Sequence, residues 1–386
     1  MHQLVFYPDY RRANPYQTLL YGHVDPVFAV KPGTIEDARP LLDLKSRRDG
    51  EVIFHLHWED SALRAIKDAD EAERAARRFM IELDRFVEAG GRLVWTKHNL
   101  RPHDFIHAEL AEEISAIVAA NAEAIIVHSP AAIHAVGEHY QIDRKRFSLQ
   151  IHGNYRKHYP TLARSSARER LGLDPDRRCL LLFGRITAYK GGDLLVRALN
   201  DLDDPSLHLL VVGKQPFEAL DVPVSLKDRV TMIDRFVDDR EVAEAFAAAD
   251  AVALPYQEIL TSGTLFLAMG AERPVIVPRL PTLLEFANEE VAFSYRPDDV
   301  ASLIEALQAF AQTSDDQLSA MGRRAGLLTE SHDWHLAGRQ LSDILHGLLA
   351  RRPRETFGRI AQTDRTQATA PGYLTRLTDP MLDAAD

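Results

Sequence analysis

Several features that define common protein classes are missing from this 386-residue sequence. It has one cysteine, Cys179, so it can form neither an internal disulfide nor a cysteine-based zinc site. No run approaches the roughly 18 apolar residues of a membrane-spanning helix, and the N-terminus lacks the basic start and apolar core of a signal peptide. Positive charge is in deficit, because 46 Lys and Arg face 57 Asp and Glu, which argues against nucleic-acid binding. We therefore expect a cytoplasmic protein with no nucleic-acid partner.

Two nucleotide-binding signatures are also missing. No G-x4-G-K-[ST] phosphate loop occurs, and no G-x-G-x-x-G follows a predicted strand. Their absence disfavours a nucleotide hydrolase and a dehydrogenase. No segment repeats with a period of about 20–50 residues, which excludes a solenoid.

The chain instead alternates short apolar runs with longer helical patterns, which is typical of βα units around a mostly parallel sheet. In the first half we expect strands at 4–7, 52–57, 93–96 and 124–128, and helices at 16–22, 61–89, 108–120 and 130–140. In the second half we expect strands at 179–183, 207–212, 230–233, 251–254, 275–277 and 291–293, and helices at 192–202, 239–249, 262–270, from about 297, and 334–349. This pattern predicts an α/β protein with two Rossmann-like domains facing each other across a cleft.

We place the first domain at residues 1–160 and the second at 161–350, followed by a polar tail at 351–386. Polar residues 161–170 are interpreted as the connection between the two. Residues 1–160 carry 21 basic and 23 acidic side chains, whereas residues 161–386 carry 25 and 34. Most of the negative charge therefore belongs to the second half.

The strand predicted at 179–183 is followed by the sequence G-R-I-T-A-Y-K-G-G, which begins at Gly184. A glycine permits a sharp turn, and Arg185 and Lys190 then flank the start of a helix. Two cations beside unsatisfied helix amides suit a diphosphate, because ligands of such sheets bind beyond the carboxyl ends of the strands. The alternative is a loop whose basic residues face water.

A second candidate anion site is the segment P-Y-Q-E-I-L-T-S-G-T between a predicted strand and helix. Thr261, Ser262 and Gly263 offer small side chains and free amide groups at the start of the helix. The alternative is an ordinary N-cap, for which Thr and Ser are also preferred.

Polar side chains also gather at predicted strand ends of the first half, in residues 55–59 and 97–104, and between the halves in 152–155. These segments are rich in histidine, and we expect them to line a cleft as partners of a polyhydroxylated ligand or as acid and base groups. Capping histidines and a zinc site made of histidines alone are the alternatives.

Two further patterns are weaker. Asp-x-Asp occurs at 174–176 and at 201–203, in loops that enter strands on the wrong side of the sheet for a ligand. Arg74, Arg77 and Arg78 cluster on a predicted helix, which indicates either a solvated face or contact with anionic lipid at the inner membrane surface.

Together these motifs resemble the glycosyltransferases of the GT-B fold over roughly residues 1–345. The segments of the first half are similar to those of bacterial exopolysaccharide mannosyltransferases, of the xanthan type that use GDP-mannose and a glycolipid; they are Asn14-Pro15-Tyr16, His55–Glu59, His98–Asp104 and His152–Tyr155. The resemblance implies a metal-independent hexosyltransferase in which the nucleotide-sugar is a substrate and no cofactor is needed. GDP-mannose is the favoured donor and a UDP-sugar the alternative, with a glycan or lipid-linked saccharide as acceptor.

The resemblance also implies roles for individual residues. Arg185 and Lys190 in the turn begun by Gly184, with the Thr261–Gly263 amides, are expected to hold the donor diphosphate. The nucleobase of the donor is expected near Gly213 and the segment around Phe236. The donor sugar is expected towards His98, and the acceptor in the first half. The candidate acceptor-binding residues are Asn14, Tyr16, His57, His152 and Asn154.

One departure from the large retaining GT-B group concerns its two glutamates, eight positions apart, around the second anion site. Ile259 and Leu267 stand at those positions here, so Glu258 or Glu285 is the candidate substitute. Retention and inversion of the anomeric centre both stay open. If the enzyme inverts, a base must deprotonate the acceptor hydroxyl, and the candidates are Glu59 and Asp104.

Two other functions fit the same fold. A nucleotide-sugar 2-epimerase would turn over without an acceptor. A non-catalytic, transferase-like partner subunit would explain the missing glutamates.

Overall fold

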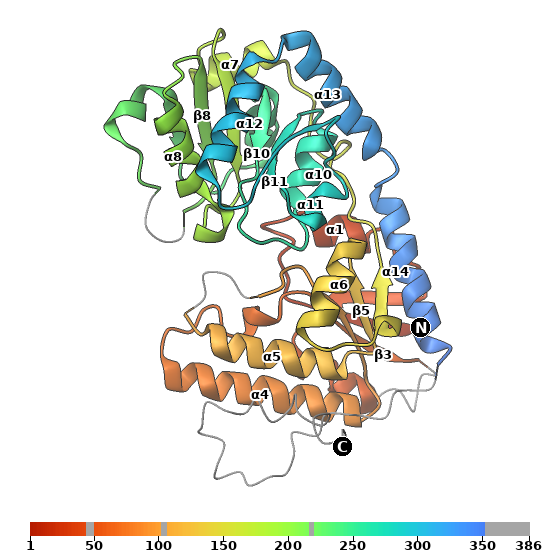
Figure 1. The fold of residues 1–386 in the computed structure, drawn as a ribbon. Coiled ribbons are helices and arrows are strands. Elements are labelled where there is room, and N and C mark those ends of the chain that lie inside the picture. Colours follow the sequence, from red (N-terminus) through yellow and green to blue (C-terminus); the bar gives the residue numbers. More distant parts are fainter. Residues whose placement is uncertain (44–49, 102–105, 216–219, 352–386) are drawn as a thin grey trace, which may run out of the picture.

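The computed structural model describes residues 1–43, 50–101, 106–215 and 220–351. Each half contains one six-stranded sheet with helices on its faces (Figure 1). The strand order is β2-β1-β3-β4-β5-β6 in the first sheet and β12-β11-β10-β7-β8-β9 in the second. Every neighbouring pair is parallel. The predicted α/β class with two Rossmann-like halves is confirmed.

The first sheet is built from apolar runs that are buried on both faces, as expected for a parallel sheet covered by helices. Its strands are β1 (His2–Tyr7), β2 (Phe28–Pro32), β3 (Val52–Leu56), β4 (Arg92–Thr96), β5 (Ala124–Val127) and β6 (Phe147–Leu149). Its helices are α1 (Tyr16–Tyr21), α2 (Ile35–Ala38), α4 (Ala69–Glu88), α5 (Ala108–Asn121) and α6 (Pro130–His139). The edge strands β2 and β6 were not predicted, because they are short and only partly buried.

The second half has the same alternation. Its strands are β7 (Arg178–Phe183), β8 (Leu207–Val212), β9 (Val230–Ile233), β10 (Ala251–Ala253), β11 (Val275–Pro278) and β12 (Ala292–Tyr295). Its helices are α7 (Arg164–Leu171), α8 (Gly192–Leu202), α9 (Asp239–Ala248), α10 (Gly263–Gly270), α11 (Pro281–Leu284), α12 (Val300–Gln312), α13 (Asp315–Leu328) and α14 (Trp334–Leu349).

Two predicted segments differ from the structure. The helix predicted at 61–89 is divided into a 3-10 turn, η1 (Glu59–Ala62), and α4, because the Asp68 carboxylate accepts from the Glu71 amide and starts a new helix. The polar segment 161–170, expected to be a connection, contains most of α7.

The last helix crosses back to the first half, as Figure 1 shows for α14. It packs on α1, and the Gln150 side chain donates to the Ala337 carbonyl at 3.0 Å. Gly338 allows this contact, because a Cβ there would lie 2.5 Å from His23 Cβ. The last helix of the second domain, predicted as 161–350, therefore packs against the first half.

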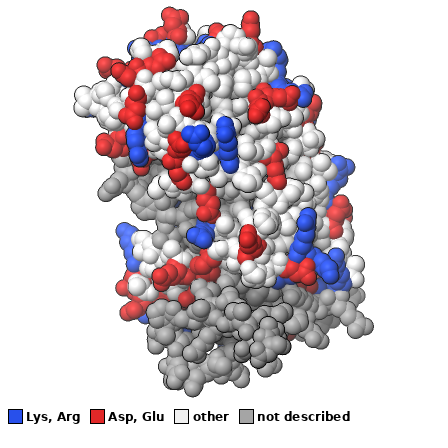
Figure 2. All heavy atoms as spheres, in the orientation of Figure 1, with Lys and Arg blue, Asp and Glu red and all other residues white. Residues whose placement is uncertain are grey.

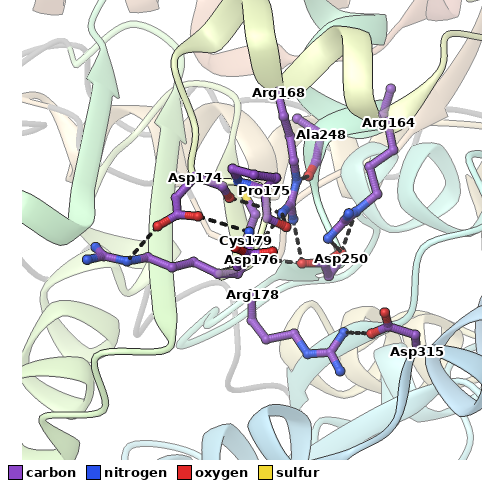
Figure 3. Close-up of polar contacts among 12 residues, drawn as sticks. Arg164, Arg168, Asp174, Pro175, Asp176, Arg178, Cys179, Ala248, Asp250 and Asp315 are labelled. Atoms are coloured by element: carbon purple, nitrogen blue, oxygen red, sulfur yellow. Dashed lines mark hydrogen bonds and ion pairs between the residues drawn. The ribbon is translucent and has the colours of Figure 1, made fainter.

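A buried guanidinium holds the second half together on the side where β7 begins (Figure 3). Arg168 donates to the carbonyls of Asp174, Pro175, Arg177 and Ala248 and pairs with Asp250 at 2.6 Å. Asp250 also accepts from the Cys179 amide at 2.7 Å. The cluster joins α7, the start of β7 and the end of α9, so these residues serve the fold.

The surface charge follows the sequence. On the face shown in Figure 2, acidic side chains are spread over the upper half, with few basic ones among them. Among the described residues, no helix is long and apolar enough to cross a membrane.

Candidate active site

Two glycines meet where β7 and β8 end. Gly184 has φ +102° and Gly213 has φ +137°, both in the region that favours glycine. A Cβ on Gly213 would lie 1.9 Å from the Gly184 carbonyl oxygen, and one on Gly184 would lie 2.7 Å from Lys190 Nζ. The predicted turn therefore brings two backbone segments and a lysine together at the carboxyl edge of the sheet.

Lys190 is the principal cation of this turn. Its side chain is 8% exposed, and Nζ donates to the Phe183 carbonyl at 3.1 Å. Burial lowers its pKa to about 8, and within the described residues no carboxylate pairs with it. Arg185 is exposed and makes no hydrogen bond or ion pair in the same part of the chain. The site thus presents two cations without a protein counter-charge.

Both candidate donor segments contain buried polar atoms without a hydrogen-bond partner in the described chain. Thr187 Oγ1, Glu258 Oε1 and Thr261 Oγ1 are buried without a hydrogen-bond partner among the described residues. Such atoms carry a desolvation cost that a bound polar ligand would relieve. The role of Glu258 as a donor contact stays a prediction.

Ser262 has the N-cap role that is the alternative to anion binding. Its Oγ accepts from the Leu265 amide at 3.1 Å and bonds the Tyr256 hydroxyl at 2.9 Å. The amides of Gly263 and Thr264 donate no hydrogen bond within the described chain, so the start of α10 still offers anion contacts.

Glu285 lies elsewhere than predicted. Its Oε1 accepts from the Ala131 amide at 2.8 Å, at the start of α6 in the first half. The neighbouring helices α6 and α11 pack together, and Leu260 is buried with Val127. Glu285 therefore joins the two halves, and its role in donor binding stays a prediction.

Five histidine rings of the first half form a continuous row between the sheet edge and the second half; they are His55, His57, His98, His128 and His152. The His152 ring stacks on Phe266 of α10 with a centroid distance of 4.8 Å. A Cβ on Gly263 would lie 3.7 Å from His152 Nε2. The row therefore reaches the start of α10, so the structure brings the predicted first-half residues and one of the predicted donor segments together.

Burial makes all five imidazoles weak bases. It lowers the pKa of His55 and His152 to about 3 and that of His128 to about 4, and it holds the pKa values of His57 and His98 well below the usual value. The rings are therefore neutral at pH 7, and each has one donor and one acceptor nitrogen.

A hydrogen-bond chain orients the two rings nearest the sheet edge. The Tyr21 hydroxyl lies 2.9 Å from His55 Nδ1 and 2.7 Å from His57 Nε2, and His57 Nδ1 lies 3.0 Å from His98 Nε2. Among the described residues, His98 Nδ1 has no hydrogen-bond partner, whereas Nε2 is engaged by His57. Sequence reasoning missed Tyr21, because nothing in a short helix marks a tyrosine that bridges two strand-end histidines.

Glu59 does not have the geometry of a free base. Its Oε1 accepts from Lys97 Nζ at 2.5 Å and Ser115 Oγ at 2.6 Å, and its Oε2 accepts from Trp95 Nε1 at 3.0 Å. Burial alone would raise its pKa, but the Lys97 charge and these hydrogen bonds lower it. The expectation that Glu59 deprotonates the acceptor is therefore corrected. The other candidate, Asp104, lies outside the described residues.

Asp60 is a carboxylate that the sequence did not single out. It borders a cavity of about 10 Å³, also lined by His57, His98 and Arg101. Burial raises the pKa of Asp60, although an ion pair with Arg64 opposes the shift. A carboxylate with a raised pKa beside His98 is a candidate acid or base.

Three predicted acceptor-binding residues have structural partners. Asn14 Oδ1 accepts from the Tyr16 amide at 2.9 Å, and the Tyr16 side chain is 2% exposed among the histidine rings. Asn154 Nδ2 donates to the Thr329 carbonyl at 2.7 Å, where the chain passes between the halves. These contacts argue that Tyr16 and Asn154 position the site.

The structure also bears on the metal alternatives. No group of three or more His, Cys, Asp or Glu side chains in the described chain is arranged to hold a metal ion. The five rings of the row are engaged with one another and with hydroxyl and carbonyl groups.

Comparisons with known proteins agree with this architecture. Residues 177–313 match the family model described as glycosyl transferases group 1. The chain is similar to the GDP-mannose:glycolipid 4-beta-D-mannosyltransferase of Xanthomonas campestris pv. campestris, with 27% identity over 84% of this chain and 86% of that protein.

Two solved structures have a similar fold. A glycosyltransferase from Rickettsia africae ESF-5 gives a TM-score of 0.65 at 13% identity, over 90% of this chain and 98% of that one. Anabaena Alr3699/HepE in complex with UDP-glucose gives 0.63 at 18% identity, over 90% and 100%. The predicted GT-B fold is confirmed.

Proposed function

We propose that this protein, a glycosyltransferase of the GT-B fold, transfers mannose from GDP-mannose to a lipid-linked saccharide without a metal ion. One observation carries the proposal: Lys190 is a buried cation with no carboxylate partner in the described chain. A buried charge is costly unless it is paired, so its natural partner is a ligand anion. Arg185 and the unsatisfied Thr187 Oγ1 belong to the same turn.

The chemistry of transfer follows from this arrangement. The acceptor hydroxyl attacks C1 of the sugar, the bond from C1 to the phosphate oxygen breaks, and negative charge grows on the leaving nucleoside diphosphate. Lys190, Arg185 and the amides at the start of α10 are fixed donors that stabilise this charge as it develops. Cations of the protein would do the work for which other transferases use a metal ion.

His98 is our candidate for the base that accepts the proton of the acceptor hydroxyl. Its Nε2 is held by His57, so Nδ1 is the nitrogen that the acceptor can reach. Asp60 borders the same small cavity and is the second candidate. Tyr21 and His57 are positioning residues in this account, because they fix the tautomer and orientation of His98.

The choice of mannose, and of a glycolipid as acceptor, rests on the similarity to the Xanthomonas enzyme, which extends over both halves of the chain. A lipid-linked acceptor places the enzyme at a membrane surface during exopolysaccharide synthesis in the cytoplasm. Arg74, Arg77 and Arg78 are exposed on α4 and would make the peripheral contact with anionic lipid.

The test is product analysis with GDP-[14C]mannose, a glycolipid acceptor fraction and EDTA. We expect label in the lipid fraction, unchanged by EDTA and lost in His98→Ala. Exposed His134→Ala is the matched control and should keep full activity. Label released as free mannose or epimer without acceptor would refute the proposal, as would a transfer that EDTA abolishes.

A further inference from the structure

A second cavity, of about 410 Å³, shares no lining residue with the small cavity beside His98. It is bounded by the segment that joins the two halves, by α9, by the end of α10 and by α13. The donor segment is at the start of α10, whereas the cavity touches Gly270 and Ala271 at its end. Gly270 follows Gly263 by seven positions, which is about 10 Å along the helix.

The wall of the cavity has both polar and apolar parts. Its apolar lining comes from Tyr155, Leu162, Val242, Phe246 and Leu267. Its volume falls within the range of about 300–1,000 Å³ that is typical of small-molecule sites. An apolar tail is therefore the part of a ligand that this wall would bury.

The charged part of the lining is unlike the rest of this acidic half. Arg156, Arg273 and Arg323 face a single acidic residue, Glu272, which pairs with Arg156 at 2.8 Å. Arg273 Nε donates to the Phe246 carbonyl at 2.8 Å, which holds its guanidinium at the wall. Arg323 is exposed and has no ion pair or hydrogen bond within the described residues. The lining thus has an excess of two positive charges.

We propose that this cavity is a second ligand site, which takes a phosphate monoester with an apolar tail. Guanidinium groups bind phosphate through paired N–H donors, and a dianionic headgroup matches the excess charge of the lining. The tail would lie against Phe246 and Leu267 of α9 and α10. The proposal does not depend on Lys190, Arg185 or the amides at the start of α10, since none of these groups lines the cavity.

The test is calorimetric titration with octyl phosphate below its micellar concentration, beside octanol and inorganic phosphate. We expect octyl phosphate to bind at least tenfold more tightly than either. Arg323→Glu should weaken binding about tenfold, as expected for loss of one charge-assisted contact. Ala243→Leu, which adds volume at the cavity wall, should also weaken it.

Arg324→Glu is the matched control, because Arg324 is the next residue on α13 but pairs with Glu290 at 3.0 Å. It should bind octyl phosphate like the unmodified protein. Pelleting of the protein with vesicles of phosphatidylcholine and phosphatidic acid distinguishes a phosphate headgroup in a bilayer from a free amphiphile. If the parent protein pellets with the vesicles and Arg323→Glu does not, the ligand is a bilayer headgroup. If the parent protein does not pellet, the ligand is a free amphiphile. Equal binding by the unmodified protein and Arg323→Glu would overturn the proposal. So would octanol binding as tightly as octyl phosphate, or no binding of octyl phosphate.

Discussion

Replacing Lys190 with methionine should stabilise the protein at pH 7 while it weakens donor binding. The buried ammonium has a pKa of about 8, against an ordinary value of 10.5. A tenfold change in proton affinity corresponds to about 1.4 kcal/mol, so the charge costs the folded state about 3 kcal/mol. Methionine also loses the hydrogen bond from Nζ to the Phe183 carbonyl, worth about 1 kcal/mol. The net gain for Lys190→Met is about 2 kcal/mol.

The sign of the effect changes with pH. The cost of the charge is present in full below pH 8, because both the folded and the unfolded protein are then protonated at Lys190. It declines as pH rises from 8 to 10.5, since the folded state has released its proton and the unfolded state has not. Near pH 10.5 the advantage of the variant should disappear, and the lost hydrogen bond should leave it about 1 kcal/mol less stable.

The assay is urea unfolding of both proteins at pH 7, 9 and 10.5. Lys227→Met is the control, because Lys227 is exposed and its replacement should change the free energy of unfolding by less than about 0.5 kcal/mol at every pH. A variant less stable than the parent at pH 7, or a difference that does not vary with pH, would refute the reasoning.

Three further predictions concern groups that the fold has buried. Glu59→Gln should destabilise the protein by about 3–5 kcal/mol in urea unfolding, because Lys97 is left as an unpaired buried charge; adding Lys97→Met should recover much of the loss. The Cys179 thiol should react with Ellman's reagent at pH 8 only in urea, since burial raises its pKa to about 12; rapid reaction of the native protein would contradict its placement. Arg168→Met should lower the unfolding free energy by about 3–5 kcal/mol, whereas Arg164→Met, which removes a more exposed partner of the same carboxylate, should cost less than about 1 kcal/mol.

The parts of the fold that the sequence predicted are those set by local patterns. The run C-L-L-L-F ending at Phe183 is apolar enough to be a buried strand, and Gly184 after it requires a turn. Strands β2 and β6 were not predicted, because Phe28–Pro32 and Phe147–Leu149 are short and partly exposed and have no periodic pattern.

The placement of α14 shows a second feature that the sequence pattern does not predict. Its apolar positions predict a helix with one buried face, and the residues Trp334–Leu349 form that helix. The pattern does not say which half covers the face. That is decided by Gly338, which lets the helix approach His23.

In the candidate site, too, local sequence predicts some residues, whereas contacts between distant segments decide others. Arg185, Lys190 and Gly263 could be predicted because their spacing follows directly from a strand or a helix start. Glu59 was misassigned because its partner Lys97 is on another strand end, and the contact of Glu285 with an amide of the other half could not be predicted either. Contacts between elements far apart in sequence decide whether a carboxylate is free or engaged.

The central claim is that the uncompensated cations of the second half hold the diphosphate of the sugar donor. Calorimetric titration of GDP-mannose and of UDP-glucose into the parent protein, Arg185→Ala and Lys190→Met tests it most directly. We predict that GDP-mannose binds the parent more tightly than UDP-glucose does. We also predict that each substitution weakens GDP-mannose binding by about tenfold or more, the effect of losing one charge-assisted hydrogen bond. Unchanged affinity in both variants would contradict the account.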